Sequence, residues 1–144
     1  MTQLRQIPDA RGAVLHMLRN DAPDFLQFGE CYFSEVLPGA VKGWKRHRVQ
    51  TQTLAVPVGR MRMVMYDDRS ESLTYKNLLA LELGRPDAYV RLKIPPGIWY
   101  GFACVGDFPA LLVNCADYPH EPSEGETRPL DTPEIPYNWA THLS

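Results

Sequence analysis

The chain has 144 residues, of which 44% are hydrophobic and 22% are charged, and its formal net charge at pH 7 is −2. These values are ordinary for a globular protein and exclude a generally basic surface for nucleic acid or acidic lipid. No apolar run reaches the roughly 18 residues of a membrane-spanning helix, and the N-terminus lacks a signal-peptide core. Three cysteines without C-x-x-C spacing indicate free thiols in a reducing compartment. We therefore expect a single cytoplasmic domain over residues 1–144, with neither nucleic acid nor membrane as a partner.

Prolines and glycines punctuate the chain every few residues, which favours short strands and turns over long helices. Many short strands without alternating helices predict a β-barrel or a β-sandwich. The segment 75–83 fits either a strand or a short helix. In chain order, strands are expected at 13–18, 25–37, 41–48, 51–58, 60–66, 89–94, 98–102 and 109–115.

Two of these strands have informative alternation. Met61, Met63 and Met65 share one face of their strand, and this apolar stripe predicts core packing. The strand 41–48 holds the densest group of basic side chains in the protein. Strict alternation places Val41, Gly43, Lys45 and His47 on one of its faces and Lys42, Trp44, Arg46 and Arg48 on the other.

The composition changes at Pro119, where the chain becomes rich in proline and acidic residues. We expect a core over about 9–118 and an extended C-terminal arm over 119–144. Tyr137 and Trp139 in this arm are expected to dock on the barrel or on a partner subunit. His142, near the end of the arm, is expected to have no functional role.

From Gly39 the chain runs five residues to Lys45, one to His47, four to Gln52 and six to Gly59. These intervals match the first cupin motif, in which His, His and Glu bind a metal ion at the three middle positions. The second motif, Pro-x-Gly followed two residues later by His, is matched at 95–97 with Tyr100 at the histidine position. One histidine in four ligand positions, beside a protonated lysine, gives a cation little affinity. We therefore expect a cupin frame that holds no metal and no other cofactor.

Five segments, 9–12, 39–43, 66–70, 94–102 and 117–122, resemble the dTDP-4-dehydrorhamnose 3,5-epimerase family, metal-free cupins of nucleotide-sugar metabolism. The run Ile-Pro-Pro-Gly-x-x-x-Gly-Phe at 94–102 is the most specific of them. The resemblance implies an all-β, cupin-type jelly roll (a double-stranded β-helix) with an N-terminal strand. It also implies a homodimer that exchanges N-terminal strands and a nucleotide-sugar bound in the mouth of the barrel.

The same resemblance assigns family roles to individual positions. The histidine base of the family's Arg-Gly-x-His motif falls on Lys45. The lysine that stabilises the enolate falls on Gln52, and the tyrosine acid falls near Val113. Arg11 matches an arginine that contacts the nucleotide diphosphate, and Lys42 matches another basic residue. This sequence therefore matches the family more closely at the positions that bind the nucleotide than at those that carry out the reaction.

Removing a proton next to a ketone requires a base within hydrogen-bond reach and a group that holds the enolate oxygen. His47 has a suitable intrinsic pKa, whereas Lys45 would need a pKa lowered by neighbouring positive charge. A tyrosine, either Tyr66 or Tyr100, could donate the second proton. We expect catalysis from His47, Lys45 and Tyr100, and substrate binding by Arg11, Lys42, Gln52, Arg62, Tyr66 and Trp99.

The expected function is a nucleotide-sugar epimerase or isomerase acting on a 4-keto-6-deoxyhexose in deoxysugar and polysaccharide biosynthesis. One alternative is a cupin that binds a sugar nucleotide without catalysis. A second is a sugar 3,4-ketoisomerase, whose Arg-Gly-x-His-x-His motif places its second histidine on His47. A metal-dependent cupin such as a dioxygenase is a third and fits the ligand count least well.

Overall fold

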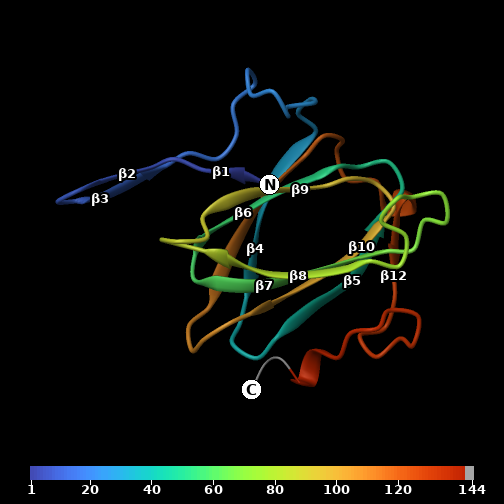
Figure 1. The fold of residues 1–144 in the computed structure, drawn as a ribbon. Helices are drawn as coiled ribbons and strands as arrows, with labels where there is room; N and C mark the ends of the chain where they lie inside the picture. Colours follow the sequence, from blue (N-terminus) through green and yellow to red (C-terminus); the bar gives the residue numbers. More distant parts are fainter. Residues whose placement is uncertain (142–144) are drawn as a thin grey trace.

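The computed structural model describes residues 1–141 as two facing antiparallel sheets (Figure 1). The first sheet has the order β1 (Thr2–Gln3), β9 (Val90–Ile94), β6 (Gln52–Val58), β11 (Ala110–Ala116), β4 (Glu30–Val36). The second has the order β12 (Gly125–Thr127), β5 (Val41–His47), β10 (Ile98–Cys104), β7 (Arg60–Asp67), β8 (Leu78–Gly84). A hairpin of β2 (Gln6–Asp9) and β3 (Gly12–Leu15) projects away from both sheets, as Figure 1 shows. The expected all-β jelly roll is confirmed.

The main core lies between the sheets. Met61, Met63 and Met65 are buried there against side chains of the first sheet, as the strand alternation predicts. Val64 and Tyr66, on the other face of β7, belong to a second cluster on the outer side of the second sheet. Both faces of this sheet are therefore covered, one by the first sheet and the other by the C-terminal arm.

The arm is less extended than expected, because it contributes β12 and two short 3₁₀ turns, η1 (Pro122–Glu124) and η2 (Trp139–Thr141). Its apolar end docks on the barrel, the first of the two expected surfaces. Trp139 is buried with its ring 5.2 Å from that of Trp44. A Cβ on Gly101 would lie 2.8 Å from Trp139 Cζ2, so glycine at this position lets the indole reach the sheet. His142 lies outside the described residues.

The alternation expected for strand 41–48 is wrong at its start. Tyr100 pairs with Lys45 but Phe102 pairs with Lys42, so β5 carries an extra residue at a bulge. Lys42 therefore faces the same side as Lys45, and Val41 packs with the outer cluster. A Cβ on Gly43 would lie 2.8 Å from the Gly101 Cα, so the bulge requires glycine. Two lysines thus enter the space between the sheets.

Two further expectations are settled by strand pairing. The segment 75–83, which fits either a strand or a short helix by sequence, contains most of strand β8, and β8 pairs along its length with β7. The strand expected to begin at residue 25 begins at Glu30. Gly29, the residue before it, lies too close to the backbone of Tyr118 for any side chain. Within residues 1–141 no helix has the length and apolar character to cross a membrane.

Candidate active site

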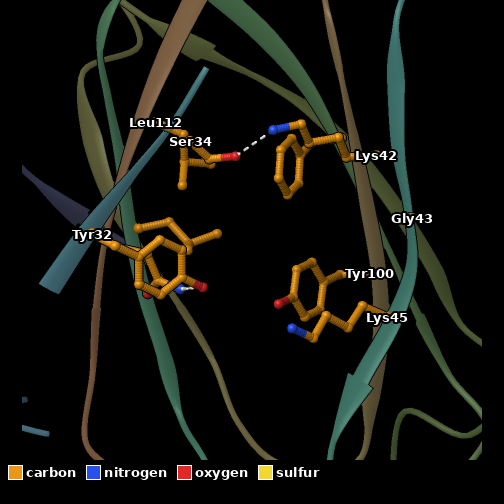
Figure 2. A pocket seen from close by; sticks show the side chains of 10 residues that line it. Tyr32, Ser34, Lys42, Gly43, Lys45, Tyr100 and Leu112 are labelled. Atoms are coloured by element: carbon orange, nitrogen blue, oxygen red, sulfur yellow. Dashed lines mark hydrogen bonds between the residues drawn. The ribbon is translucent and has the colours of Figure 1, made fainter. Parts of the chain in front are cut away.

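A cavity of 220 Å³ lies between the two sheets and receives side chains from five strands (Figure 2). Its polar groups come from β4, β5, β10 and β11. Lys42 Nζ donates a hydrogen bond of 2.8 Å to Ser34 Oγ at one end. The lining residues are Tyr32, Ser34, Lys42, Gly43, Lys45, Leu54, Tyr100, Phe102, Leu112 and Asn114.

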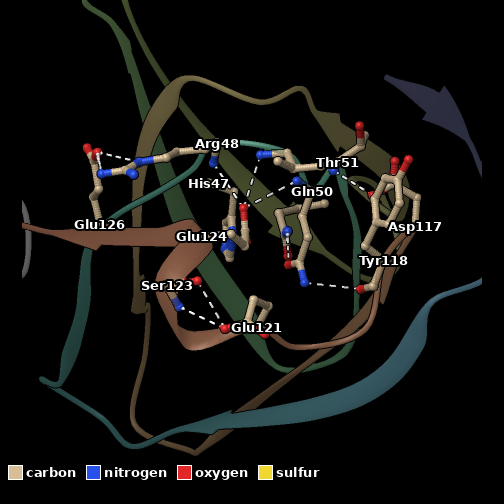
Figure 3. Close-up of polar contacts among 12 residues, drawn as sticks. His47, Arg48, Gln50, Thr51, Asp117, Tyr118, Glu121, Ser123, Glu124 and Glu126 are labelled. Carbon is tan, nitrogen blue, oxygen red and sulfur yellow. Dashed lines mark hydrogen bonds and ion pairs between the residues drawn. The ribbon is translucent and has the colours of Figure 1, made fainter.

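Behind one wall of the cavity, Tyr100 is linked to His47 and then to Glu124. The Tyr100 hydroxyl lies 3.1 Å from His47 Nε2, and His47 Nδ1 is hydrogen-bonded to Glu124 Oε1. The other carboxylate oxygen accepts the backbone N–H groups of Arg48 and Val49, both at 3.0 Å (Figure 3). A carboxylate only accepts, so the imidazole proton lies on Nδ1 and Nε2 accepts the Tyr100 proton.

The surroundings determine the charge of each member of this chain. Burial lowers the pKa of His47, against the opposite effect of its hydrogen bond to Glu124. Burial would raise the pKa of Glu124, but hydrogen bonds from His47 and from backbone N–H groups hold that pKa below its ordinary value. Burial raises the pKa of Tyr100 far above the usual range of a phenol. At neutral pH, Tyr100 is therefore a neutral phenol, His47 a neutral imidazole and Glu124 a carboxylate.

A second phenol, that of Tyr32, occupies the opposite wall. Figure 2 shows the rings of Tyr32 and Tyr100 on facing walls, with their hydroxyls turned toward each other. Asn114 Nδ2 donates to the Tyr32 oxygen at 2.8 Å and also to Gln52 Oε1. Because the Tyr32 oxygen already accepts from Asn114, its own proton is available to the cavity. Burial raises the pKa of Tyr32, which keeps this phenol protonated.

Several residues predicted from the sequence meet in this region. Lys42, Lys45 and Tyr100 line the cavity itself. His47 is buried behind Tyr100, and Gln52 is buried behind Asn114.

The sequence alone does not identify Tyr32, Asn114 and Glu124 as members of this site. Tyr32 and Asn114 sit on strands that the sequence did predict, but only the pairing of β4 with β11 brings their side chains together. Glu124 lies in the arm, 77 residues after its partner His47, and no local pattern indicates that contact.

Three predicted binding residues lie on the other face of the second sheet, away from the cavity. Tyr66 and Trp99 are buried under the arm, and Trp99 Nε1 donates to Asp68 at 2.8 Å. Arg62 forms an ion pair of 2.9 Å with Glu82. Tyr66 and Trp99 thus contribute to the attachment of the arm, and none of the three residues lies in the cavity wall.

Arg11 is on the projecting β2–β3 hairpin, exposed and paired with Asp9 at 2.8 Å. It does not approach the cavity of its own chain. Among residues 1–141, no group of three or more His, Cys, Asp and Glu side chains could hold a metal ion. At the cupin ligand positions, the two ring nitrogens of His47 are engaged by Glu124 and Tyr100.

Comparison with known proteins gives consistent matches along nearly the whole chain. A crystal structure of a dTDP sugar isomerase from Desulfovibrio desulfuricans is 57% identical, with a TM-score of 0.95, over 96% of this chain and 88% of that one. A probable low-salt glycan biosynthesis epimerase of Haloferax volcanii is 35% identical over 94% of this chain and 88% of its own length. A spore coat polysaccharide biosynthesis protein of Bacillus subtilis is 27% identical, over 98% and 94% respectively.

The family model of dTDP-4-dehydrorhamnose 3,5-epimerase matches residues 1–144. This match agrees with the jelly-roll arrangement of the sheets and with a cavity between them that receives two lysines and two tyrosines. The chain therefore belongs to the dTDP-4-dehydrorhamnose 3,5-epimerase family of sugar-nucleotide epimerases.

Proposed function

We propose that this protein is a sugar-nucleotide epimerase that inverts a carbon next to the C4 ketone of a dTDP-4-keto-6-deoxyhexose. The observation that carries the proposal is the pair of phenols on facing walls of the cavity, each held by its own partner. Inversion requires a proton to leave one face of a carbon and another to arrive on the opposite face. Tyr100 and Tyr32 supply one group for each face.

Removal of the proton begins at Tyr100. Its oxygen takes the proton from the carbon while its own hydroxyl proton passes to His47 Nε2, so the phenol stays neutral. The imidazolium that forms is stabilised by the Glu124 carboxylate at Nδ1. This arrangement overcomes the high pKa of Tyr100, since His47 and not the phenol stores the proton.

The electrons of the broken C–H bond move to the ketone oxygen and form an enolate. Lys45 and Lys42, both in the cavity wall, provide the positive charge that stabilises this oxygen and attracts the anionic nucleotide. Lys45 thus acts as an electrostatic group and not as the base that the family motif would place there. Tyr32 then donates its proton to the carbon from the opposite wall. The cycle closes when the His47 imidazolium releases its extra proton to solvent and the Tyr32 phenolate takes one up from solvent, so the site gains and loses one proton each turnover.

The proposal includes a homodimer that works in the cytoplasm. The β2–β3 hairpin leaves its own sheets, and its Ile7 and Val14 side chains are exposed, which favours contact with a second copy. Arg11 lies on the same hairpin, where it would contact the nucleotide bound to the partner. Light scattering should give twice the chain mass, and Val14→Asp should reduce it to one chain mass.

The activity is tested by incubating the protein with the dTDP-4-keto-6-deoxyhexose in heavy water and following C3 and C5 by NMR. Wild-type protein should incorporate deuterium and change configuration at the same carbon. Tyr100→Phe should lose both changes, whereas Tyr75→Phe, a surface tyrosine, should lose neither. Absence of deuterium uptake above the buffer rate would overturn the proposal, and thermal stabilisation by the nucleotide-sugar without exchange would support the non-catalytic alternative.

Tyr32→Phe separates the two proton transfers. This variant keeps the group that removes the proton but lacks the donor on the opposite face. Deuterium should therefore still enter the carbon, from the Tyr100 side, with configuration retained. Full inversion by Tyr32→Phe would exclude Tyr32 as the acid.

A further inference from the structure

Two of the three cysteines form a close pair on the outer surface of the first sheet. Cys31 of β4 and Cys115 of β11 are directly paired residues, and the Cys115 thiol donates to Cys31 Sγ at 3.4 Å. Their sequence neighbours Tyr32 and Asn114 line the cavity. Since successive side chains of a strand point to opposite faces, the two thiols lie directly behind that cavity wall.

The backbone at this position suits a covalent link. Directly opposed residues of antiparallel strands have Cα atoms about 4.5 to 5.5 Å apart, within the range of about 4.4 to 6.8 Å found for disulfides. The sulfurs need to approach from 3.4 Å to about 2.05 Å, which side-chain rotation provides. Cys104 differs from both, because it is buried and donates to the Phe108 carbonyl at 3.0 Å.

The accessibility of the two sulfurs sets their order of reaction. Cys31 is exposed and Cys115 is half-buried, so a reagent in solution meets Cys31 first. Burial raises the pKa of the Cys115 thiol to about 12, which disfavours its attack on a reagent in solution. Its attack on a mixed disulfide at Cys31 is favoured instead by proximity, since the two sulfurs lie 3.4 Å apart. Cys31 is therefore the entry point and Cys115 the resolving thiol.

We propose that Cys31 and Cys115 are a reversible modification site that low-molecular-weight disulfides, such as oxidised glutathione, convert to an intrachain disulfide. Cys31 Sγ attacks the reagent disulfide, forms a mixed disulfide and releases one small thiolate. Cys115 Sγ then attacks Cys31 Sγ, and the second small thiolate leaves and takes up the Cys115 proton. One disulfide of the reagent is reduced for each disulfide formed in the protein, so electrons and protons balance.

The bond would connect β4 and β11 immediately behind the Tyr32–Asn114 hydrogen bond. The thiol state therefore controls how firmly this wall of the cavity is held. Amide hydrogen exchange in the two strands should slow at least about tenfold on oxidation, because opening the pair would then require movement of both strands together. Unchanged exchange in an oxidised sample would overturn this coupling.

The site is tested by treating the folded full-length protein with oxidised glutathione, alkylating the remaining thiols and analysing peptides by mass spectrometry without reduction. The expected product has lost about 2 Da per chain, links the peptides of Cys31 and Cys115, and reverts with dithiothreitol. Cys104→Ser should behave like wild type, and Cys115→Ser should stop at a glutathione adduct on Cys31. Accumulation of that adduct in wild type with Cys115 still alkylatable, or a link between two chains, would overturn the proposal.

Discussion

Replacing Glu124 by glutamine tests whether this carboxylate sets the position of the proton on His47. Oε1 accepts from His47 Nδ1, while Oε2 faces the backbone N–H groups of Arg48, Val49 and Gln50. Glutamine has a single accepting oxygen, which these backbone donors will hold, so its NH₂ group must face His47 Nδ1. His47 Nδ1 then accepts a hydrogen bond from this NH₂ group, and the ring proton moves to Nε2. As a result, Nε2 no longer accepts a hydrogen bond from Tyr100.

The expected loss in kcat is about 10²- to 10⁴-fold, the contribution of a positioned proton acceptor. KM should change little, because Glu124 does not line the cavity. The free energy of unfolding should fall by about 1.5 kcal/mol, since hydrogen bonds to a charged group are replaced by neutral ones. Glu121→Gln is the matched control: Glu121 caps η1 through Ser123 and does not touch His47.

The tautomer can be measured without substrate. Two-bond ¹H–¹⁵N correlation spectra of the His47 ring should show the protonated nitrogen at Nδ1 in wild type and at Nε2 in Glu124→Gln. An unchanged tautomer would refute the argument from acceptor count. A shifted tautomer with kcat within twofold of wild type would instead refute His47 as the store for the Tyr100 proton.

Three other changes have defined outcomes. Burial lowers the pKa of His47 below 6.5, so kcat/KM should stay constant as pH falls through 6.5 and should decline only at the lowered pKa of His47. The free energy of unfolding should decrease as pH falls from 6.5 to that lowered pKa, because the unfolded chain binds more protons in this range. Trp139→Ala should lower the free energy of unfolding, measured with urea, by about 3 to 5 kcal/mol, because it removes a large buried side chain. Trp139→Phe should lower it less, because it keeps an aromatic ring and loses an indole N–H that has no acceptor within residues 1–141. Asp67→Asn should cost about 2 kcal/mol, measured the same way, since Arg69, Ser72 and Thr74 all donate to that carboxylate.

Most strands are predictable because each carries its own periodic pattern. Met61, Met63 and Met65 identify the buried face of β7, and turn residues mark both of its ends. The pattern fails where backbone geometry departs from strict alternation. The bulge at Gly43 reverses the face of Lys42, and its cause is a close approach to Gly101, which lies 58 residues further along the chain.

The site is less predictable than the fold because its members meet only through tertiary pairing. The spacing from Gly39 to Gly59 does indicate where Lys45 and His47 lie, but it says nothing of what they contact. Glu124 reaches His47 because β12 pairs with β5, with Gly125 opposite His47. The composition of the arm indicates an acidic, proline-rich segment and contains no signal for that pairing.

The pairing of β12 with β5 also has a consequence for folding of the protein during its synthesis on the ribosome. β5 is complete at residue 47, yet the strand that covers its outer edge is synthesised only after residue 124. Until then the nascent chain presents an unpaired strand edge, which is a template for association with other chains. The basic side chains of Arg46 and Arg48 lie along that edge and later pair with Glu126. Before the arm is synthesised, Arg48 lacks its Glu126 partner and Arg46 has only Asp68. The positive charge left on this edge should therefore repel the same edge of a neighbouring nascent chain.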